Sequence, residues 1–410
     1  MLLAFVLGCQ PEAGLTPAEN ETTPTWHGEV RPIVESACVA CHQEGEAGGF
    51  PLDSYELVSA MSEQVADAVE DRRMPPWLAG PGCNDYQYDI SLSEQEIETL
   101  VAWHDAGAPE GDPEASVEGK EMEWRELPRV DVTLAAPSYI PDGAVEDDYR
   151  CFVVEWPEQG NFVTGYDIRP ENPELVHHVV LYLADSELAP DFQAADDADE
   201  GAGYSCYGGP GVVGASNADW LGAWAPGAVS GEFPEGTGIW VGSGDVIVFQ
   251  VHYNMKNAEP AEDLIEIDLM VEDSVPDPAL IQPWADPSWI DSEKMEIPAN
   301  SEGTQHDFGI RIPDQWAFRI HTASVHMHEL GRSARIWATH EDGTEECVLD
   351  VPRWDFAWQR SYLLEEAVDI PGGTTLTLEC TWDNPTGEDV FWGDGTGDEM
   401  CLGTMFLTSL

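Results

Sequence analysis

The sequence contains few basic residues. Its 410 residues include 16 Lys and Arg against 79 Asp and Glu, which gives a formal net charge of -63. A surface of this sign repels nucleic acid phosphates and anionic lipid headgroups, so nucleic acid is excluded as a partner. Strong charge imbalance is typical of disordered chains, but 16 Trp, 12 Phe and 11 Tyr supply apolar area to bury. The acidity therefore belongs to the surface of folded domains.

Long apolar runs are also missing, so no helix is expected to span a membrane. The N-terminus has a short apolar run, MLLAFVLGCQ, which lacks a basic residue and reaches Cys9. It resembles a bacterial lipoprotein signal, in which this cysteine is lipidated after cleavage. The alternative is an ordinary N-terminus with a chance cysteine. We expect an exported, periplasmic or cell-surface lipoprotein in which residues 1–25 form the signal and tether, and only acyl chains enter the membrane.

The rest of the sequence begins with a helical part. Residues 26–111 show helical spacing and short loops, and Ser93 and Glu96 have the spacing of a capping box ahead of an apolar stripe. Residues 109–119 are acidic and contain Pro and Gly, which predicts an exposed linker. We therefore expect a small all-α domain at 26–111, followed by a linker at 112–128.

Beyond residue 129, short runs rich in Val, Ile, Phe, Tyr and Thr are separated by Gly, Pro, Asn and Asp. Strands at this density, without helices between them, favour antiparallel sandwiches or jelly rolls. An acidic, proline-rich stretch at 272–298 indicates a break, so we expect two all-β domains at 129–278 and 279–410. The expected strands are Tyr149–Glu155, Val176–Leu183, Asp245–Tyr253, Leu264–Val271, Ala317–His321 and Thr374–Trp382.

A motif in the helical part, Cys38-Val39-Ala40-Cys41-His42, has the CxxCH pattern. In this pattern two thiols attach a haem covalently, and the adjacent imidazole is the proximal iron ligand. A redox dithiol would need a thioredoxin-like βαβ context, and a zinc site would need a second cysteine pair at metal spacing. Neither pattern is present. The motif therefore predicts haem c bound by Cys38, Cys41 and His42.

The sixth iron ligand requires a soft or imidazole donor downstream of this motif. Met74 is followed by two prolines, whose fixed backbone suits a turn that holds a thioether on iron. Met61 and His104 are the alternatives, although Met61 fits a helix core better and His104 a surface or core position. With these residues the segment 26–111 resembles the small class I cytochromes c.

Two histidine groups stand out in the first half of the β-rich part. His177 and His178 enter a predicted strand, where adjacent side chains face opposite sides, so both can bind one metal only at a strand end or irregularity. The alternative is one core and one surface histidine. Gln250 and His252 share a strand face with apolar residues, as a metal ligand and a polar neighbour would. A lone buried histidine is the alternative there.

The second half of the β-rich part contains His326 and His328. Their i, i+2 spacing places both imidazoles on one face of a strand, as a two-histidine metal clamp requires. Near the C-terminus, Met400 adjoins Cys401. A soft thioether together with two imidazoles favours copper over zinc or magnesium, whereas Met400 alone would be a core residue.

Together these motifs resemble the copper type II ascorbate-dependent monooxygenases, the family of peptidylglycine α-hydroxylating monooxygenase and dopamine β-monooxygenase. The order HH, Q-x-HY, HxH followed by LGR, and EMC is reproduced over residues 130–410. The resemblance implies two copper ions in two jelly-roll domains, with O2 and ascorbate or another reductant as partners. It assigns the electron-transfer copper to His177, His178 and His252, with Gln250 beside them. It assigns the catalytic copper, where oxygen is activated, to His326, His328 and Met400.

The sequence departs from the peptide-amidating members, which hold a peptide carboxylate with Arg, Asn and Tyr. At those positions it has Ser324, Leu402 and Thr404. Without the fork of a guanidinium, a carboxylate substrate loses its natural partner.

The resemblance also implies a disulfide between Cys380 and Cys401, beside the methionine ligand. Six cysteines outside the N-terminus and the CxxCH motif are consistent with an oxidising compartment. The remaining four allow three pairings. They are Cys83, Cys151, Cys206 and Cys347.

The expected function is that of an exported oxidoreductase. We expect a copper monooxygenase that uses O2 to hydroxylate an activated C–H bond of a small organic substrate. The fused haem c domain would relay the electrons. The alternative is a non-catalytic exported electron carrier or copper-binding lipoprotein on the same fold. Oxygen-dependent product formation distinguishes the two. A ligand-binding or adhesive β-sandwich with incidental histidines is a third interpretation, and such a protein would be purified without copper.

Overall fold

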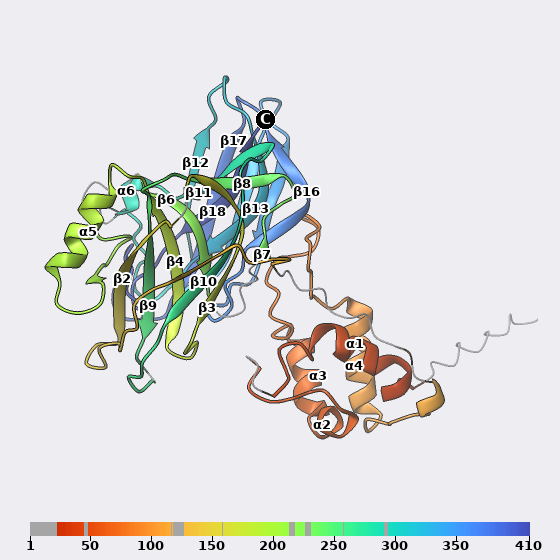
Figure 1. The fold of residues 1–410 in the computed structure, drawn as a ribbon. Coiled ribbons are helices and arrows are strands. Elements are labelled where there is room, and N and C mark those ends of the chain that lie inside the picture. Colours follow the sequence, from red (N-terminus) through yellow and green to blue (C-terminus); the bar gives the residue numbers. More distant parts are fainter. Residues whose placement is uncertain are drawn as a thin grey trace, which may run out of the picture. The chain divides into compact units, whose positions relative to one another are not determined.

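The computed structural model describes residues 23–44, 48–115, 117, 127–157, 159–212, 218–225, 231–256, 258–290 and 294–410. These residues form two compact units. The first lies within Met1–Pro75 and Leu92–Glu121, and the second within Pro76–Ser91 and Met122–Leu410. Figure 1 shows that helices make up the first unit and that strands predominate in the second. The proposed lipidation site at Cys9 and most of the predicted linker lie outside the described residues.

The first unit is helical, as the sequence predicts, and the capping box is confirmed. Ser93 Oγ accepts a hydrogen bond from the Glu96 amide, and the Glu96 carboxylate accepts one from the Ser93 amide. These two bonds satisfy amides that the first helical turn leaves without partners. The elements are η1 (Trp26–Val30), α1 (Arg31–Ala37), α2 (Tyr55–Ala60), α3 (Ser62–Glu70), α4 (Glu94–Asp105) and η2 (Pro113–Ala115).

Within the described residues, the second unit consists of two β-sandwiches. Every strand predicted from the sequence is present, with most ends shifted by one or two residues. The N-terminal half contains β1 (Val132–Ala135), β2 (Asp147–Glu155), β3 (Asn161–Pro170), β4 (Val176–Ala184), α5 (Ala189–Ala198), β5 (Tyr204–Ser205), β6 (Asp219–Trp224), β7 (Gly231–Glu232), β8 (Thr237–Val241), β9 (Val246–Asn254) and β10 (Ile265–Glu272). The C-terminal half contains β11 (Asp277–Trp284), α6 (Pro287–Ile290), β12 (Ser301–Arg311), β13 (Phe318–His326), β14 (Gly331–Thr339), β15 (Glu345–Val351), β16 (Tyr362–Ile370), β17 (Thr375–Asn384) and β18 (Leu402–Ser409).

In the N-terminal half, strands β1, β10, β3 and β8 form one layer, and β6, β4, β9, β2 and β5 form the other. Apolar side chains of both layers fill the core between them. Strand β9 is buried along almost its whole length because α5, through Phe192, covers its other face. Two polar residues lie in this buried strand, His252 at 2% and Gln250 at 4% exposure. Their polar atoms therefore need partners inside the protein.

In the C-terminal half, the sheet β12-β17-β14-β15 packs against strands β13, β16 and β18. Strand β11 pairs with β18 on one side and with β6 and β8 on the other, so one sheet continues through both halves. The stretch 272–298, predicted as a break between domains, therefore contains a strand that connects them. Exposure alternates along β11, where Ala279 and Ile281 pack against the N-terminal core and Leu280 and Gln282 are exposed.

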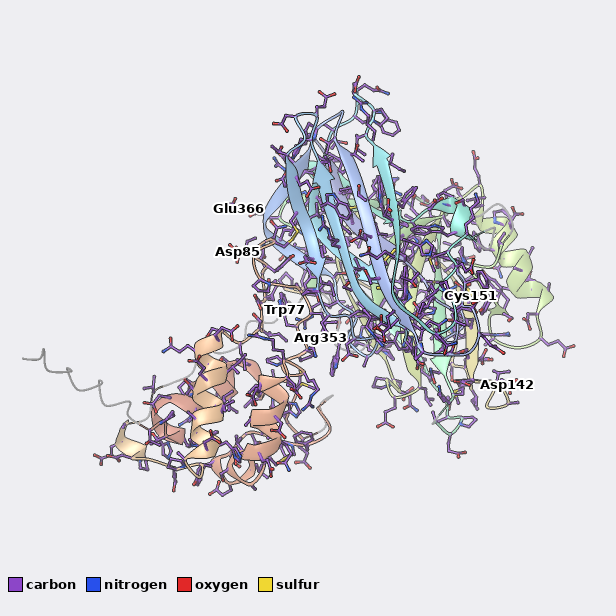
Figure 2. All side chains as sticks on the ribbon, turned by 180° about the vertical axis from the view of Figure 1, so that it is seen from behind. Trp77, Asp85, Asp142, Cys151, Arg353 and Glu366 are labelled. Atoms are coloured by element: carbon purple, nitrogen blue, oxygen red, sulfur yellow. A yellow bond between two sulfur atoms is a disulfide. The ribbon has the colours of Figure 1, made fainter. Side chains whose placement is uncertain are left out.

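The segment Pro76–Ser91 belongs to the β unit, although the sequence analysis placed it in the helical domain. Cys83 forms a disulfide with Cys347, and the Asn84 side chain donates hydrogen bonds to two carbonyls of β15, each at 2.9 Å. Trp77 packs edge-on against Tyr362. Figure 2 labels Trp77 and Asp85 of this segment. The segment lacks both helical and strand periodicity, so its sequence gave no sign of this attachment.

Six of the described cysteines form three disulfides. The bridge implied by the resemblance, Cys380–Cys401, is present. Among the described residues, no helix is long and apolar enough to cross a membrane. The bridges are Cys83–Cys347, Cys151–Cys206 and Cys380–Cys401.

The capping box predicts a local loss of stability. Replacing Ser93 with Ala removes the oxygen that caps α4, which should cost about 1 kcal/mol. Amide hydrogen exchange of Ile97 to Asp105 in the full chain should then become about fivefold faster, as that free energy implies. The matched control is Ser91→Ala, two residues away and also exposed. Equal exchange rates in the two variants would contradict the capping role.

Candidate metal centres

The first candidate centre lies where β4 begins, next to β9. His178 pairs with His252 across the two strands, and the register shifts between Val176 and His178. This irregularity lets the adjacent residues His177 and His178 approach the same point, as the sequence analysis required of a strand end. Their ring centroids lie 5.3 Å apart, and each is 4.9 Å from the His252 ring.

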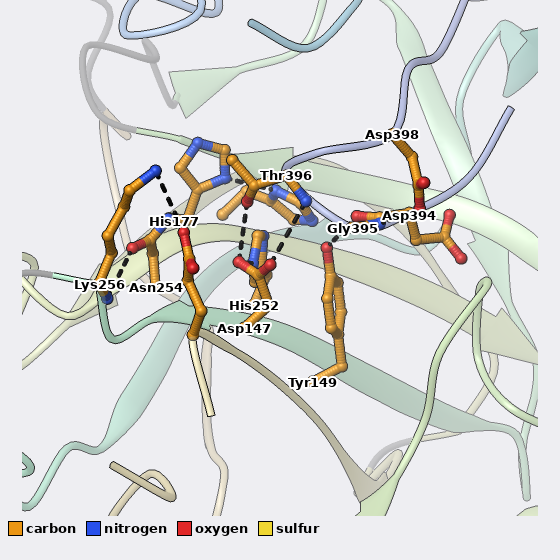
Figure 3. Close-up of polar contacts among 12 residues, drawn as sticks. Asp147, Tyr149, His177, His252, Asn254, Lys256, Asp394, Gly395, Thr396 and Asp398 are labelled. Atoms are coloured by element: carbon orange, nitrogen blue, oxygen red, sulfur yellow. Dashed lines mark hydrogen bonds and ion pairs between the residues drawn. The ribbon is translucent and has the colours of Figure 1, made fainter. Parts of the chain in front are cut away.

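The ring nitrogens of these three histidines converge. One nitrogen from each residue lies within 4.8 Å of the others, and the Nδ1 atoms of His177 and His178 are 3.2 Å apart. His252 Nε2 donates to Asp147 Oδ1 at 2.9 Å (Figure 3), whereas its Nδ1 is buried and has no hydrogen-bond partner among the described residues. A buried lone pair without a donor is costly. A cation held between the three nitrogens would satisfy it, so the residues fit a metal ion.

The electrostatics of this centre favour neutral imidazoles. Burial, with a smaller contribution from the neighbouring histidines, lowers the pKa of His177 to about 3 and that of His178 well below its ordinary value. The rings therefore keep their lone pairs at neutral pH, as metal ligands must. Tyr149 stacks on the His252 ring at 4.1 Å and restricts its rotation. Gln250 donates to the Gly209 carbonyl at 2.5 Å.

The second candidate centre is formed by His326, the last residue of β13, and His328, just beyond the strand. Their ring centroids are 5.1 Å apart. His326 Nδ1 donates to Gln359 Oε1 at 2.7 Å, and His328 Nδ1 donates to the Asp398 carbonyl at 3.1 Å. Both bonds fix the tautomer in which Nδ1 has the proton and Nε2 has the lone pair. Burial lowers the pKa of His326 to about 3 and that of His328 to about 4.

Glu399 connects this histidine turn to Met400. Its carboxylate is fully buried and accepts hydrogen bonds from the amides of His328, Leu330 and Met400 and from Trp382 Nε1. Burial raises the pKa of Glu399 to about 7, although these bonds oppose the shift. One side chain thus fixes the backbone of two candidate ligands.

Both candidate centres face one cavity of about 210 Å³. His178 and Gln250 line it from the N-terminal half, and His326, His328 and Met400 from the C-terminal half. The rings of His178 and His326 are 6.3 Å apart. The structure therefore brings both ligand sets predicted from the sequence to one place. Aromatic side chains also line the cavity, namely Tyr149, Tyr166, Tyr182, Trp220 and Trp224.

The residues that replace the peptide clamp also line this cavity. Ser324 and Thr404 are paired across β13 and β18, and their hydroxyl groups hydrogen-bond to each other. Leu402 lies beside them in the lining. Arg360 and Asp394 contribute charged groups. Burial, with Asp398 nearby, raises the pKa of Asp394 to about 6.

The CxxCH motif follows α1 in the helical unit. The amides of Cys41 and His42 both donate to the Cys38 carbonyl, which winds the motif into a turn. His42 Nδ1 lies 3.1 Å from the Phe50 carbonyl, so it donates there and leaves Nε2 free as a ligand. Burial, with Cys41 nearby, raises the pKa of the Cys38 thiol to about 12. A redox dithiol needs the opposite shift, so the motif fits a haem better.

The alternative sixth ligands have other contacts. Met61 packs against the core of the helical unit, and His104 Nδ1 bonds to Ser62 Oγ at 3.0 Å. Met74 follows α3, and its amide donates to the Ala68 carbonyl. Met74 therefore stays the predicted ligand.

Sequence reasoning missed three residues that orient the imidazoles. Asp147 and Gln359 bond to His252 and His326 from distant parts of the chain. Neither residue lies in a motif that could have revealed it. Glu399 lies within the Glu-Met-Cys motif, and its position between an acidic loop and a soft ligand was the one available signal.

Comparisons with known proteins agree with the motif order. Residues 132–260 match the model of the copper type II ascorbate-dependent monooxygenase N-terminal domain, and residues 288–407 match that of the C-terminal domain. Together these matches cover more than half of the chain.

Two curated relatives are similar at low identity. A tyramine beta-hydroxylase of Caenorhabditis briggsae is 23% identical over 328 residues, covering 72% of this chain and 51% of the relative. A DBH-like monooxygenase protein 1 of Gallus gallus is 23% identical over 346 residues, covering 77% and 54%. The chain thus spans about half the length of the curated relatives it matches.

Among solved structures, PNGase F, a glycosylasparaginase from Flavobacterium meningosepticum, is 12% identical, with a TM-score of 0.30, covering 68% of this chain and 96% of the other. A score this low has no bearing on function.

The lowered histidine pKa values predict how copper binding depends on pH. At pH 6 an ordinary imidazole is about three-quarters protonated and releases that proton to a metal. Because His177, His326 and His328 stay neutral down to about pH 4, copper should release fewer than about one proton per ion at pH 6. The affinity of the protein for copper should change little between pH 7 and pH 5, and it should decrease once the pH is lower than about 4.

Isothermal titration in buffers of different ionisation enthalpy measures this proton release. The urea-unfolded chain, with ordinary imidazoles, is the control and should release more. Release of about two protons per copper from the folded protein would contradict the lowered pKa values.

Proposed function

The chain belongs, through residues 132–260 and 288–407, to the copper type II ascorbate-dependent monooxygenase family, and from this premise we propose that it hydroxylates an activated C–H bond of a small organic substrate. One oxygen atom of O2 enters the substrate and the other leaves as water, with two electrons and two protons supplied by a reductant. The observation that supports this most directly is that two unequal ligand sets face one cavity.

The ligand sets differ in softness. Three imidazoles, from His177, His178 and His252, suit a copper that exchanges electrons. Two imidazoles and the thioether of Met400 favour the reduced ion that reacts with oxygen. When bound, the coppers supply one electron each and activate O2. The protein orients the rings through Asp147 and Gln359 and lines the cavity with several aromatic side chains.

The cavity supports a substrate with an aromatic ring. Its volume of about 210 Å³ and its aromatic walls suit a single ring with a short side chain. The cavity lining holds both the Asp394 carboxyl and the Arg360 guanidinium, so it is the formal charge of -63 that favours neutral or cationic molecules over anions. The hydroxyls of Ser324 and Thr404 satisfy each other and offer no fork for a carboxylate. Glycine-extended peptides are therefore poor substrates.

The helical unit supplies the electrons in this proposal. Cys38, Cys41 and His42 hold a haem c, with Met74 as the sixth ligand. The chain leaves this unit directly after Met74 and Pro75, and the following segment is fixed to the β unit by the Cys83–Cys347 disulfide. A covalent attachment holds donor and acceptor at roughly millimolar effective concentration, so a weak docking contact is sufficient. A tethered donor also avoids the repulsion that a negatively charged reductant meets at an acidic surface.

The proposal includes export, with a lipid on Cys9 as the anchor. Three disulfides persist in an oxidising compartment and support a periplasmic or cell-surface location. The alternative of a non-catalytic electron carrier leaves the aromatic cavity beside Met400 without a role.

The first test separates the two copper sites. Met400→Leu keeps the side-chain volume but removes the sulfur, so it should abolish one copper site, retain the other and lower hydroxylation by at least about 100-fold, or about 2.7 kcal/mol. The control is Met295→Leu, a buried methionine in the same half. Hydroxylation is measured by O2 uptake against a panel of benzylic and α-C–H substrates, with a glycine-extended peptide included. Full activity in Met400→Leu, or copper below one per chain in the unaltered protein, would contradict the proposal.

The second test follows the haem. After mixing pre-reduced, copper-loaded protein with O2 and substrate, stopped-flow absorbance should show haem oxidation at the rate of turnover, because each hydroxylation needs two electrons. His42→Ala should lose activity with donors that reduce only haem and keep it with ascorbate. Haem that stays reduced while product accumulates would exclude the relay.

A further inference from the structure

We propose that the loop Asp394–Asp398 is a latch that holds the two β-sandwiches closed over the cavity and orients one imidazole of each metal centre, His252 through Thr396 and Asp147 and His328 through the Asp398 carbonyl. Thr396 and Asp147 are thus positioning residues. The inference rests on the proposed function, since it takes these histidines as copper ligands.

The loop belongs to the C-terminal half and ends beside Met400. The amide of Gly393 donates to the Glu399 carbonyl at 3.2 Å, and the amide of Asp398 donates to the Gly395 carbonyl at 2.8 Å. These bonds close the loop on itself next to the Cys380–Cys401 disulfide. Its conformation is therefore set by the same segment that positions the methionine.

Three side chains of the N-terminal half are bonded to this loop. Thr396 Oγ1 donates to Asp147 Oδ1 at 2.8 Å, and the Thr396 amide donates to Asp147 Oδ2 at 3.3 Å. Tyr149 OH donates to the Asp394 carbonyl at 2.6 Å, and Tyr207 OH lies 3.3 Å from Asp398 Oδ2. Figure 3 shows Asp147 and Tyr149 pointing from β2 toward the loop. Separating the two halves would break these contacts together.

The same loop holds one histidine of each centre, His252 through Asp147 and His328 by a direct hydrogen bond. Asp147 Oδ1, which accepts from Thr396, also accepts from His252 Nε2. At the other centre, His328 Nδ1 donates to the Asp398 carbonyl. Each bond fixes which ring nitrogen has the lone pair. The orientation of both rings therefore depends on the loop keeping its place between the halves.

The backbone connection between the halves is narrow on the N-terminal side. Strand β11 shares six residue pairs with β18 but only one with β6 and two with β8. Side-chain contacts therefore complete the connection, among them Phe406 of β18 against Phe233. The loop adds its hydrogen bonds beside the rings of His178 and His326, which are 6.3 Å apart.

The test uses Thr396→Val in the full chain, which keeps the shape of the side chain but removes the hydroxyl donor to Asp147. Thr396→Ser restores the donor and should behave like the unaltered protein. The matched control is Thr408→Val. Thr408 is equally buried, at 5% exposure against 7%, and its hydroxyl bonds to His321 outside the cavity.

Hydrogen exchange of the metal-free protein is measured first, so the result does not depend on copper. In Thr396→Val the backbone amides of residues 394–398 and those at the end of β9 near His252 should exchange about tenfold faster. In Thr396→Ser and Thr408→Val the same amides should exchange as in the unaltered protein. Faster exchange in 394–398 alone would mean a local structural role and overturn the latch.

The second measurement is the electron paramagnetic resonance spectrum after loading with Cu(II) alone. The unaltered protein should show dipolar coupling between two ions, and Thr396→Val should lose most of it while still binding two. Unchanged coupling in Thr396→Val would overturn the latch. If the exchange results hold but fewer than two coppers bind, the latch stands and the proposed function fails.

Discussion

The hydrogen bond from His252 to Asp147 is the contact on which the site depends. Strand β9 is buried on both faces, so an imidazole there is stable only if each nitrogen has a partner. Asp147 satisfies Nε2 and thereby directs the Nδ1 lone pair toward His177 and His178. The fold thus brings three ring nitrogens together and leaves His252 Nδ1 to be satisfied by a cation. A metal can then bind without reorganising the core.

A similar arrangement is repeated in the other half with different partners. There the Gln359 amide and the Asp398 carbonyl hold the outward nitrogens of His326 and His328. Buried Glu399 fixes the backbone that precedes Met400. In both halves the candidate imidazoles are held by groups that lie outside the histidine motifs. Substitutions of these groups would disturb the geometry of a ligand set while leaving every ligand in place.

Much of this molecule could be predicted from local sequence. The strands named in advance and the capping box at Ser93 follow from periodicity and spacing, which are properties of neighbouring residues. The grouping of the histidines into two sets follows from the resemblance to the copper type II monooxygenases. The attachment of Pro76–Ser91 and the bond between Asp147 and His252 could not be predicted, because each joins residues more than 100 positions apart without a repeating pattern. Strand β11 was missed because Asp277, Pro278 and Pro283 interrupt its apolar residues, and proline and aspartate are uncommon in strands.

The Cys83–Cys347 bridge has a consequence for the order in which the polypeptide matures. Its two cysteines are 264 residues apart, so the first waits unpaired until most of the chain has been synthesised. During that time the segment between α3 and α4 has no β-sheet to bind. Both cysteines lie in the β unit, so the bridge fixes Pro76–Ser91 to that unit only after the strands that hold Cys347 have been made. Oxidation of these two thiols therefore determines when the segment between α3 and α4 becomes anchored to the β unit.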